Sequence, residues 1–170
     1  MYIFDLKNVS GKEKSVGGKA GSLGEMLRMG LPVPQGFVIS ADAFENGRLK
    51  SGAAAELKDL ASRLSAADTW AVRSSAIGED GSENSFAGAY ETVLGVKPAD
   101  IEEAVLKVAA SAENERVDVY AKERNAEAGG TAVVIQKYID ADLAGVIFTA
   151  DPISGSRGKM TGSFVKGAGE

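Results

Sequence analysis

The groups in this sequence that could do chemistry are lysine, arginine, hydroxyl, carboxylate and backbone N–H groups. Its 170 residues contain no histidine and no cysteine. A Ser-His-Asp triad, an imidazole base, a histidine metal ligand and a thiol nucleophile are therefore excluded within this chain. The remaining groups suit the binding of an anion such as phosphate, because lysine, arginine and backbone N–H groups donate hydrogen bonds with full or partial positive charge.

The first candidate anion site is VGGKAGSLGEML, residues 16–27. Gly17, Gly18 and Gly21 surround Lys19, just before a run with the apolar spacing of a helix. A helix N-terminus attracts anions, and a lysine there would add a full charge. The spacing matches neither the P-loop nor the G-x-G-x-x-G fingerprint. A capped turn without a ligand therefore remains the alternative.

The second candidate is AVRSSAIGEDGSENSFAGAYET, residues 71–92. Arg73 lies where a predicted strand gives way to a loop of small residues, and its guanidinium has a donor fork that fits phosphate oxygens. The small residues at the end of the loop would let backbone approach a triphosphate. The alternative is a surface ion pair of Arg73 with Glu79, Asp80 or Glu83.

The third candidate is AVVIQKYI, residues 132–139. A strand that ends at Gln136 and runs into Lys137 and Tyr138 could present alternating backbone N–H and C=O groups to a planar base. The alternative is a core strand without any ligand.

Short helices and strands must position these groups. Apolar spacing predicts helices over residues 19–29, 56–64 and 101–127, with Gly30 as the C-terminal cap of the first. Residues 47–56 indicate a loop or a helix entry. Runs of β-branched and aromatic residues predict strands over residues 36–40, 69–76, 90–96, 131–139 and 144–150. The last two are continuous apolar runs, typical of strands that are buried on both faces or packed against a helix. The sequence therefore predicts an α+β fold.

Composition narrows the class of protein. The apolar fraction of 44% and the charged fraction of 25% are typical of a globular domain. A net charge of −5 argues against nucleic-acid binding, which usually needs a basic face. No apolar run is long enough for a membrane helix, and the first residues lack the pattern of a signal peptide. We therefore expect a cytoplasmic location and no membrane partner.

Taken together, the three candidates resemble the N-terminal nucleotide-binding domain shared by phosphoenolpyruvate synthase, pyruvate phosphate dikinase and rifampin phosphotransferase. Four blocks carry the resemblance, in the order and spacing of the family: VGGKAGSLGEML…GLPVPQGFVIS, WAVRSSAIGEDGSENSFAGAYETVLGV, AVVIQKYIDADLAGVIFTADPISG and the closing GAGE. They cover most of the chain. The resemblance implies that the ligand is ATP.

The resemblance also implies roles for individual residues. Lys19 and Arg73 would contact the phosphates, and Arg73 would take part in catalysis. The loop over the triphosphate would include Gly88 and Thr92, with Val93 nearby. The segment along adenine would consist of Gln136, Lys137, Tyr138 and Ile139.

The implied fold is a truncated ATP-grasp domain over residues 1–170, with the first subdomain and the start of the second. The family binds Mg²⁺ through carboxylates downstream of a closing G-L-G-E block, which Gly167–Glu170 resembles. Those ligands are expected to lie outside this chain, so no metal ligand is predicted within it. The tryptophan that commonly precedes the block is missing, and Val165 and Lys166 stand there instead. The phosphohistidine and substrate-binding domains are also expected to lie outside.

The implied function is the ATP-binding portion of a phosphoenolpyruvate synthase-like dikinase. The parent enzyme would convert ATP, pyruvate and water into AMP, phosphoenolpyruvate and phosphate through a phosphohistidine. A homodimer is a possible assembly of that parent, and this fragment alone is expected to be inactive. One alternative is the ATP-binding portion of a rifampin phosphotransferase-like antibiotic kinase. Another is a non-catalytic interaction module that keeps the fold.

Overall fold

The computed structural model describes residues 1–9, 13–77, 92–122 and 130–169. These residues form the following elements in chain order: β1 (Ile3–Asp5), η1 (Leu6–Asn8), α1 (Glu13–Arg28), β2 (Gly36–Ile39), η2 (Ala41–Ala43), β3 (Phe44–Glu45), β4 (Arg48–Leu49), α2 (Ser51–Arg63), β5 (Trp70–Ala76), β6 (Thr92–Val96), η3 (Pro98–Asp100), α3 (Ile101–Lys122), β7 (Thr131–Lys137), β8 (Leu143–Phe148) and β9 (Thr161–Lys166). The chain divides into two compact units, Met1–Tyr138 and Ile139–Glu170. The mixture of helices and antiparallel strands confirms the predicted α+β class.

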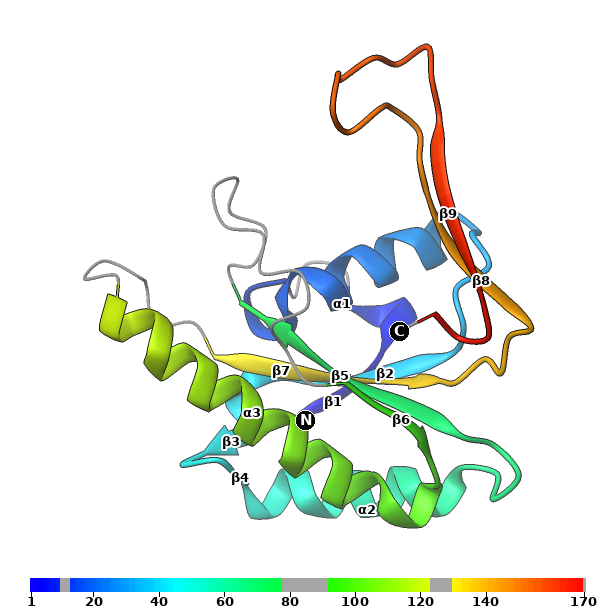
Figure 1. Cartoon of the computed structure of the whole chain (residues 1–170). Helices are drawn as coiled ribbons and strands as arrows, with labels where there is room; N and C mark the ends of the chain where they lie inside the picture. Colours follow the sequence, from blue (N-terminus) through cyan, green and yellow to red (C-terminus); the bar gives the residue numbers. More distant parts are fainter. Residues whose placement is uncertain (10–12, 78–91, 123–129, 170) are drawn as a thin grey trace. The chain divides into compact units, whose positions relative to one another are not determined.

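A five-stranded antiparallel sheet forms the centre of the first unit, with the strand order β1-β2-β7-β5-β6 (Figure 1). β7 is the middle strand, and its interior residues 132–136 are all buried. This burial follows from its position, because β7 has a neighbouring strand on each side and helices above and below it. The predicted strand with two buried faces is therefore confirmed for β7.

Helices cover both faces of this sheet (Figure 1). Because successive side chains of a strand point to opposite faces, the core falls into two clusters. Trp70 and Val72 of β5 pack in one cluster with Ile101 of α3 and with residues of α2. Val134 of β7 packs in the other cluster with Val16 of α1. One face of the sheet therefore meets α1, and the other meets α2 and α3.

Helix α1 begins earlier than the sequence predicts and contains a break. It starts at Glu13 rather than Lys19, and Gly17 interrupts it with φ of 76° and ψ of 167°. This conformation is almost exclusive to glycine. The predicted start at Lys19 corresponds to the helical segment that follows Gly17. The segment before Gly17 is not predicted, because the break interrupts the apolar spacing of the helix.

The predicted cap at the end of α1 is confirmed. Gly30 has φ of 77°. Its N–H donates to the Leu27 carbonyl at 3.1 Å, and the Leu31 N–H donates to the Met26 carbonyl at 3.0 Å. These two bonds form a Schellman motif, which satisfies carbonyl groups that a helix end leaves without partners.

Helix α2 also begins earlier than predicted, at Ser51 rather than Glu56. The expectation of a loop or helix entry over residues 47–56 rests on their content of glycine, alanine and serine. Three consecutive alanines, residues 53–55, favour the helix more strongly. Ala53 is fully buried, so packing adds to this propensity.

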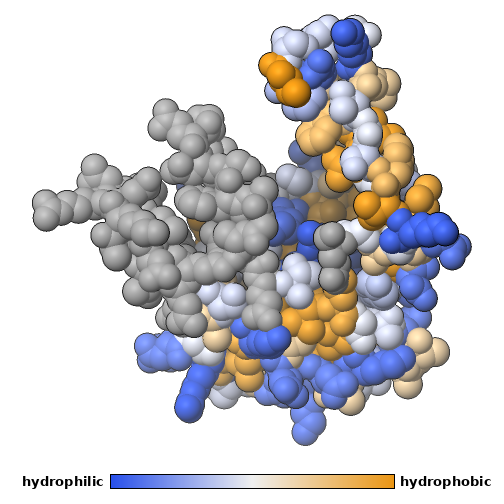
Figure 2. All heavy atoms as spheres, viewed as in Figure 1, coloured by the Kyte–Doolittle hydropathy of each residue, from blue (hydrophilic) through white to orange (hydrophobic). Residues whose placement is uncertain are grey.

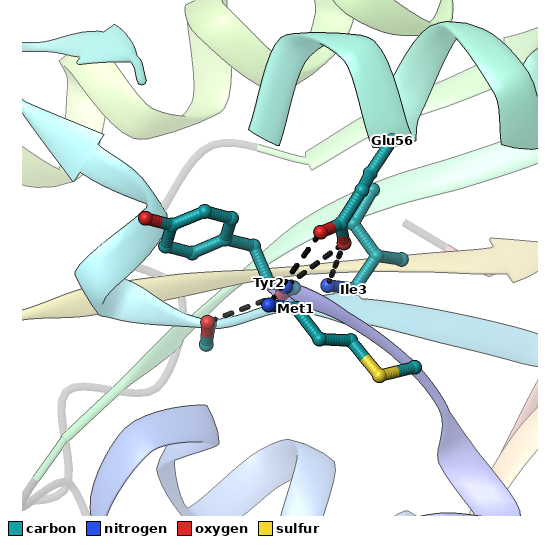
Figure 3. Close-up of polar contacts among 5 residues, drawn as sticks. Met1, Tyr2, Ile3 and Glu56 are labelled. Atoms are coloured by element: carbon teal, nitrogen blue, oxygen red, sulfur yellow. Dashed lines mark hydrogen bonds and ion pairs between the residues drawn. The ribbon is translucent and has the colours of Figure 1, made fainter. Parts of the chain in front are cut away.

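Glu56 of α2 holds the start of β1 in place (Figure 3). Its Oε2 accepts hydrogen bonds from the N–H groups of Tyr2 at 2.8 Å and Ile3 at 3.0 Å, and its Oε1 lies 3.6 Å from the amino group of Met1. Burial alone would raise the pKa of Glu56. The two backbone hydrogen bonds and the nearby ammonium outweigh burial, so the pKa of Glu56 is lowered from its ordinary value.

We expect Glu56→Gln to destabilise the protein at pH 7 by about 1 kcal/mol, since a neutral amide accepts these bonds more weakly and a partly exposed ion pair contributes little. The folded state lowers the pKa of this carboxyl, so the Glu56 contribution is present above the unfolded pKa and is lost as the pH falls through the folded one. Urea denaturation at pH 7 and at pH 3 measures this. A difference between the two proteins that persists or grows toward pH 3 would contradict the assignment.

The second unit is a two-stranded antiparallel hairpin of β8 and β9, paired from Leu143 opposite Lys166 to Phe148 opposite Thr161. Its connecting loop is ordered around Asp151, whose Oδ1 accepts hydrogen bonds from the N–H groups of Ile153 at 2.9 Å and Ser154 at 3.4 Å. These bonds lower the pKa of Asp151.

The burial predicted for residues 144–150 is wrong. Large apolar side chains of the hairpin are about half exposed or more, among them Leu143, Val146, Ile147, Phe148 and Phe164, and Figure 2 shows apolar colour along these strands. The described part of this unit contains two strands and no helix, so no second layer of its own covers them. A continuous apolar run indicates that a strand needs a covering layer, but it does not show that the same unit provides that layer.

Candidate functional site

Two of the predicted site residues project from the same face of the sheet. In the register of β5 and β7, Arg73 lies opposite Val134, and Ala71 lies opposite Gln136. Arg73 and Gln136 are therefore diagonal neighbours on one face, a spacing of about 7–8 Å that long side chains can bridge. Val134 packs in the same core cluster as Val16 of α1, so this is the face that α1 covers.

Thr92 joins this face from the neighbouring strand. It lies opposite Arg73 in the pairing of β5 with β6, so the two side chains point the same way. Val93 lies opposite Val72 and packs against the other cluster, so its side chain faces α2 and α3. The structure therefore separates these two adjacent predicted residues.

Lys19 approaches the same region from α1. Its ammonium donates a hydrogen bond to the backbone carbonyl of Ser74 at 2.7 Å, and its side chain is half-buried. Ser74 directly follows Arg73 in β5. The structure thus brings the lysine of the first candidate to the strand that carries the arginine of the second.

The Arg73 side chain is exposed, whereas its neighbours in β5 are buried. Its guanidinium makes no hydrogen bond or ion pair with any residue in the described ranges. The alternative partners Glu79, Asp80 and Glu83 lie outside the described residues, and so does the predicted loop residue Gly88. Within the described chain, Arg73 therefore supplies an uncompensated cation at the α1-covered face.

Gln136 is buried at the end of β7, with 8% of its surface exposed. Its side-chain nitrogen donates to the Pro34 carbonyl at 3.2 Å. This bond orients the amide and leaves the side-chain oxygen as an acceptor. A buried amide held in one orientation can discriminate a donor from an acceptor on a ligand.

The residues after Gln136 are fixed mainly by their backbone. The N–H of Lys137 donates to the Gln35 carbonyl, and the N–H of Tyr138 donates to the Thr69 carbonyl, each at 2.8 Å. The Lys137 ammonium lies 2.9 Å from Asp68 Oδ1. Ile139 is the first residue of the second unit. The structure thus ties Lys137 and Tyr138 to the first unit.

Ser75 is a residue that the sequence reasoning missed. Its side chain is fully buried, accepts a hydrogen bond from the Ala20 N–H at 3.1 Å and donates one to the Val16 carbonyl at 2.8 Å. Strand alternation could have placed it on the same face as Arg73, two residues earlier. Nothing in the sequence showed that this face would meet the glycine-rich stretch of α1.

The described residues contain no group of three or more acidic side chains that could hold a metal ion. None of their helices combines the length and apolar character needed to cross a membrane.

The fold and the cluster of Lys19, Arg73 and Gln136 define a helix-covered α+β domain with a cationic, partly buried face. Residues 13–69 and 46–170 match the family described as pyruvate phosphate dikinase, AMP/ATP-binding domain. The chain therefore belongs to this family of adenine-nucleotide-binding domains.

Curated relatives are named for different reactions. The chain is 36% identical to the prodigiosin synthesizing transferase PigC of Serratia marcescens, over 91% of the chain and 20% of that protein. It is 30% identical to a probable phosphoenolpyruvate synthase of Methanocaldococcus jannaschii, over 99% of the chain and 18% of that protein. It is 32% identical to a rifampicin phosphotransferase of Streptomyces sviceus, over 99% of the chain and 24% of that protein.

The chain thus spans about a fifth of the length of these relatives. The alignment with the Methanocaldococcus jannaschii protein covers 217 residues and is longer than the chain itself, so that relative has residues without a counterpart here. What the relatives share with this chain is one region of a longer protein.

Proposed function

We propose that this chain is the ATP-binding portion of a phosphotransferase and binds ATP on the α1-covered face of its five-stranded sheet. Lys19 and Arg73 bind the phosphates, and Gln136 binds adenine. One observation carries this assignment: the strand register makes Arg73 and Gln136 diagonal neighbours, and Lys19 is bonded to the residue that follows Arg73.

The chemistry of these groups fits a nucleotide. A guanidinium offers paired donors to phosphate oxygens, and an ammonium adds a compact charge. The orientation of Gln136 presents an acceptor that suits the exocyclic amino group of adenine. Thr92 lies opposite Arg73 and adds a hydroxyl beside the phosphates. Lys137, Tyr138 and Ile139 continue the segment along the base, while Val93 contributes through its backbone, because its side chain faces the other cluster.

Arg73 also has the role expected of a catalytic cation. Phosphoryl transfer depends mainly on positioning and on neutralising the charge that spreads over the transferred group. A guanidinium without a protein partner in the described ranges can direct its charge to that group.

For the whole parent protein we propose the phosphoenolpyruvate synthase reaction, in which ATP, pyruvate and water give AMP, phosphoenolpyruvate and phosphate. Several relatives carry the name phosphoenolpyruvate synthase, which supports this choice. The phosphate-carrying histidine would belong to another part of that protein, since this chain has no histidine. A rifampicin phosphotransferase is the second candidate, supported by a match over 99% of the chain. The acceptor is recognised elsewhere in either case.

The proposed architecture is the first subdomain of an ATP-grasp domain, with the β8–β9 hairpin as the start of the second. The exposed apolar side chains of the hairpin support this, because they need a covering layer that its two strands do not provide. Magnesium would be held by other residues, since the described ranges contain no acidic cluster for it.

Isothermal titration calorimetry with Mg-ATP and with adenosine tests the proposed function. We expect the wild-type chain to bind ATP, and Lys19→Ala to weaken ATP binding about tenfold while adenosine binding stays unchanged, because a hydrogen bond between charged groups contributes about 1.5–3 kcal/mol.

Lys14→Ala is the matched control, since Lys14 is an exposed lysine of the same helix. It should bind ATP like the wild type. Absence of ATP binding by the wild type would overturn the proposed function and favour a non-catalytic interaction module. Equal losses in the two lysine variants would overturn the role of Lys19.

A further inference from the structure

A side-chain hydroxyl replaces one hydrogen bond of helix α1. In a regular α-helix the N–H of Ala20 would donate to the carbonyl of Val16, four residues earlier. Here the Ala20 N–H donates to Ser75 Oγ at 3.1 Å, and Ser75 Oγ donates to the Val16 carbonyl at 2.8 Å. The hydroxyl of a strand residue is thus inserted into the hydrogen-bond ladder of the helix, which is a recognised cause of a kink.

The break at Gly17 makes room for this insertion. Gly17 is non-helical, so the second helical segment starts beyond it and its first N–H groups have no partner within the helix. A side chain at the cap position would normally accept one of these hydrogen bonds. Gly17 has no side chain, and Ser75 supplies the oxygen from β5 instead.

Two adjacent residues of β5, Ser74 and Ser75, hold the backbone around Lys19 and its side chain. Ser75 binds the backbone on either side of Lys19, at Val16 and Ala20. Ser74 accepts the Lys19 ammonium at its carbonyl. Lys19 is therefore positioned from β5, the strand that carries Arg73 on the same face as Ser75.

We propose that Ser75 is a positioning residue for phosphate recognition, which fixes Lys19 relative to Arg73 so that both cations reach one triphosphate. This inference rests on the proposed function, because it concerns the binding of ATP. Ser75 does not touch the nucleotide in this arrangement. It acts through Lys19.

Ser74 provides a matched control in the adjacent position. It is as deeply buried as Ser75, but its hydroxyl has no hydrogen-bond partner among the described residues, and its register opposite Val133 turns it toward the other face of the sheet. Ser74→Ala keeps the carbonyl that accepts from Lys19. The two serines thus differ in the hydrogen bonds of their hydroxyl groups.

A double-mutant cycle tests the proposal in the full chain, with Mg-ATP and adenosine binding measured by calorimetry. We expect Ser75→Ala to weaken ATP binding about tenfold and to leave adenosine binding unchanged. In the Lys19→Ala background, the same change should weaken ATP binding less than about twofold, because the group that Ser75 positions is gone. Ser74→Ala should bind ATP like the wild type.

A merely structural role gives a different pattern. Equal losses from Ser75→Ala in the two backgrounds, or an equal loss of adenosine binding, would overturn the role of Ser75 and leave the proposed function intact. Failure of the wild type to bind ATP would overturn the proposed function itself. If Ser75→Ala does not fold, Ser75→Cys carries the test, because its thiol keeps a weak donor and acceptor at nearly the same size.

Discussion

Gly17→Ala is expected to destabilise the protein by about 3 kcal/mol, because it combines a forbidden backbone conformation with a collision. With φ of 76° and ψ of 167°, Gly17 occupies a region that residues with a Cβ atom essentially never adopt. An added Cβ would collide with the carbonyl oxygen of Ser75 and would lie 2.7 Å from that of Ala76. The backbone of β5 cannot move aside without disturbing its pairing with β7.

Gly30→Ala separates the two causes. Gly30 follows the end of the same helix, has φ of 77°, and has no atom of the described residues within 4 Å of the position that an added Cβ would take. We expect a loss of about 1 kcal/mol from the backbone conformation alone. Urea denaturation of both variants measures the difference. Equal losses would contradict the close packing of α1 against β5.

Arg73→Ala is expected to weaken Mg-ATP binding about 100-fold, the largest functional loss among the variants considered. Arg73 supplies a donor fork whose charge no described protein group compensates, so a phosphate would gain its full interaction. Arg73→Lys should keep part of this affinity, with a loss of about tenfold, because an ammonium retains the charge but not the paired donors. Calorimetry with ATP and adenosine measures both variants.

Arg48→Ala controls for the loss of any surface arginine. Arg48 is an exposed residue of β4, in a separate two-stranded sheet. It should bind ATP like the wild type, and adenosine affinity should be unchanged in all three variants. Wild-type ATP affinity in Arg73→Ala would rule out the proposed phosphate site.

Strand positions are the most predictable part of this fold. The expected spans of β2, β5 and β7 agree with the structure to within two residues, because each is a compact β-branched or aromatic run with clear boundaries. Strand periodicity then determines which residues share a face once the register is known. Register itself depends on pairing between distant segments, so the sequence alone does not place Arg73 diagonal to Gln136.

The less predictable features arise where tertiary contacts override local pattern. The first segment of α1 escapes prediction because Gly17 resembles a helix breaker, and the hydroxyl of Ser75 that bridges the break is 59 residues from Val16. The apolar sequence of β8 predicts burial, but burial requires a partner layer as well. The three-residue strand β1 is held by Glu56, a contact that periodicity does not reveal.

The central position of β7 has a consequence for the order of assembly. The pairings of β1 with β2 and of β5 with β6 involve no residue of β7. β7 is the last of the five strands along the chain, yet it joins these two pairs. During synthesis, the edges of β2 and β5 therefore remain without their partner until about residue 137 has emerged. Closure of the sheet and alignment of Gln136 with Arg73 thus both require the insertion of β7, the last of the five strands to be synthesised.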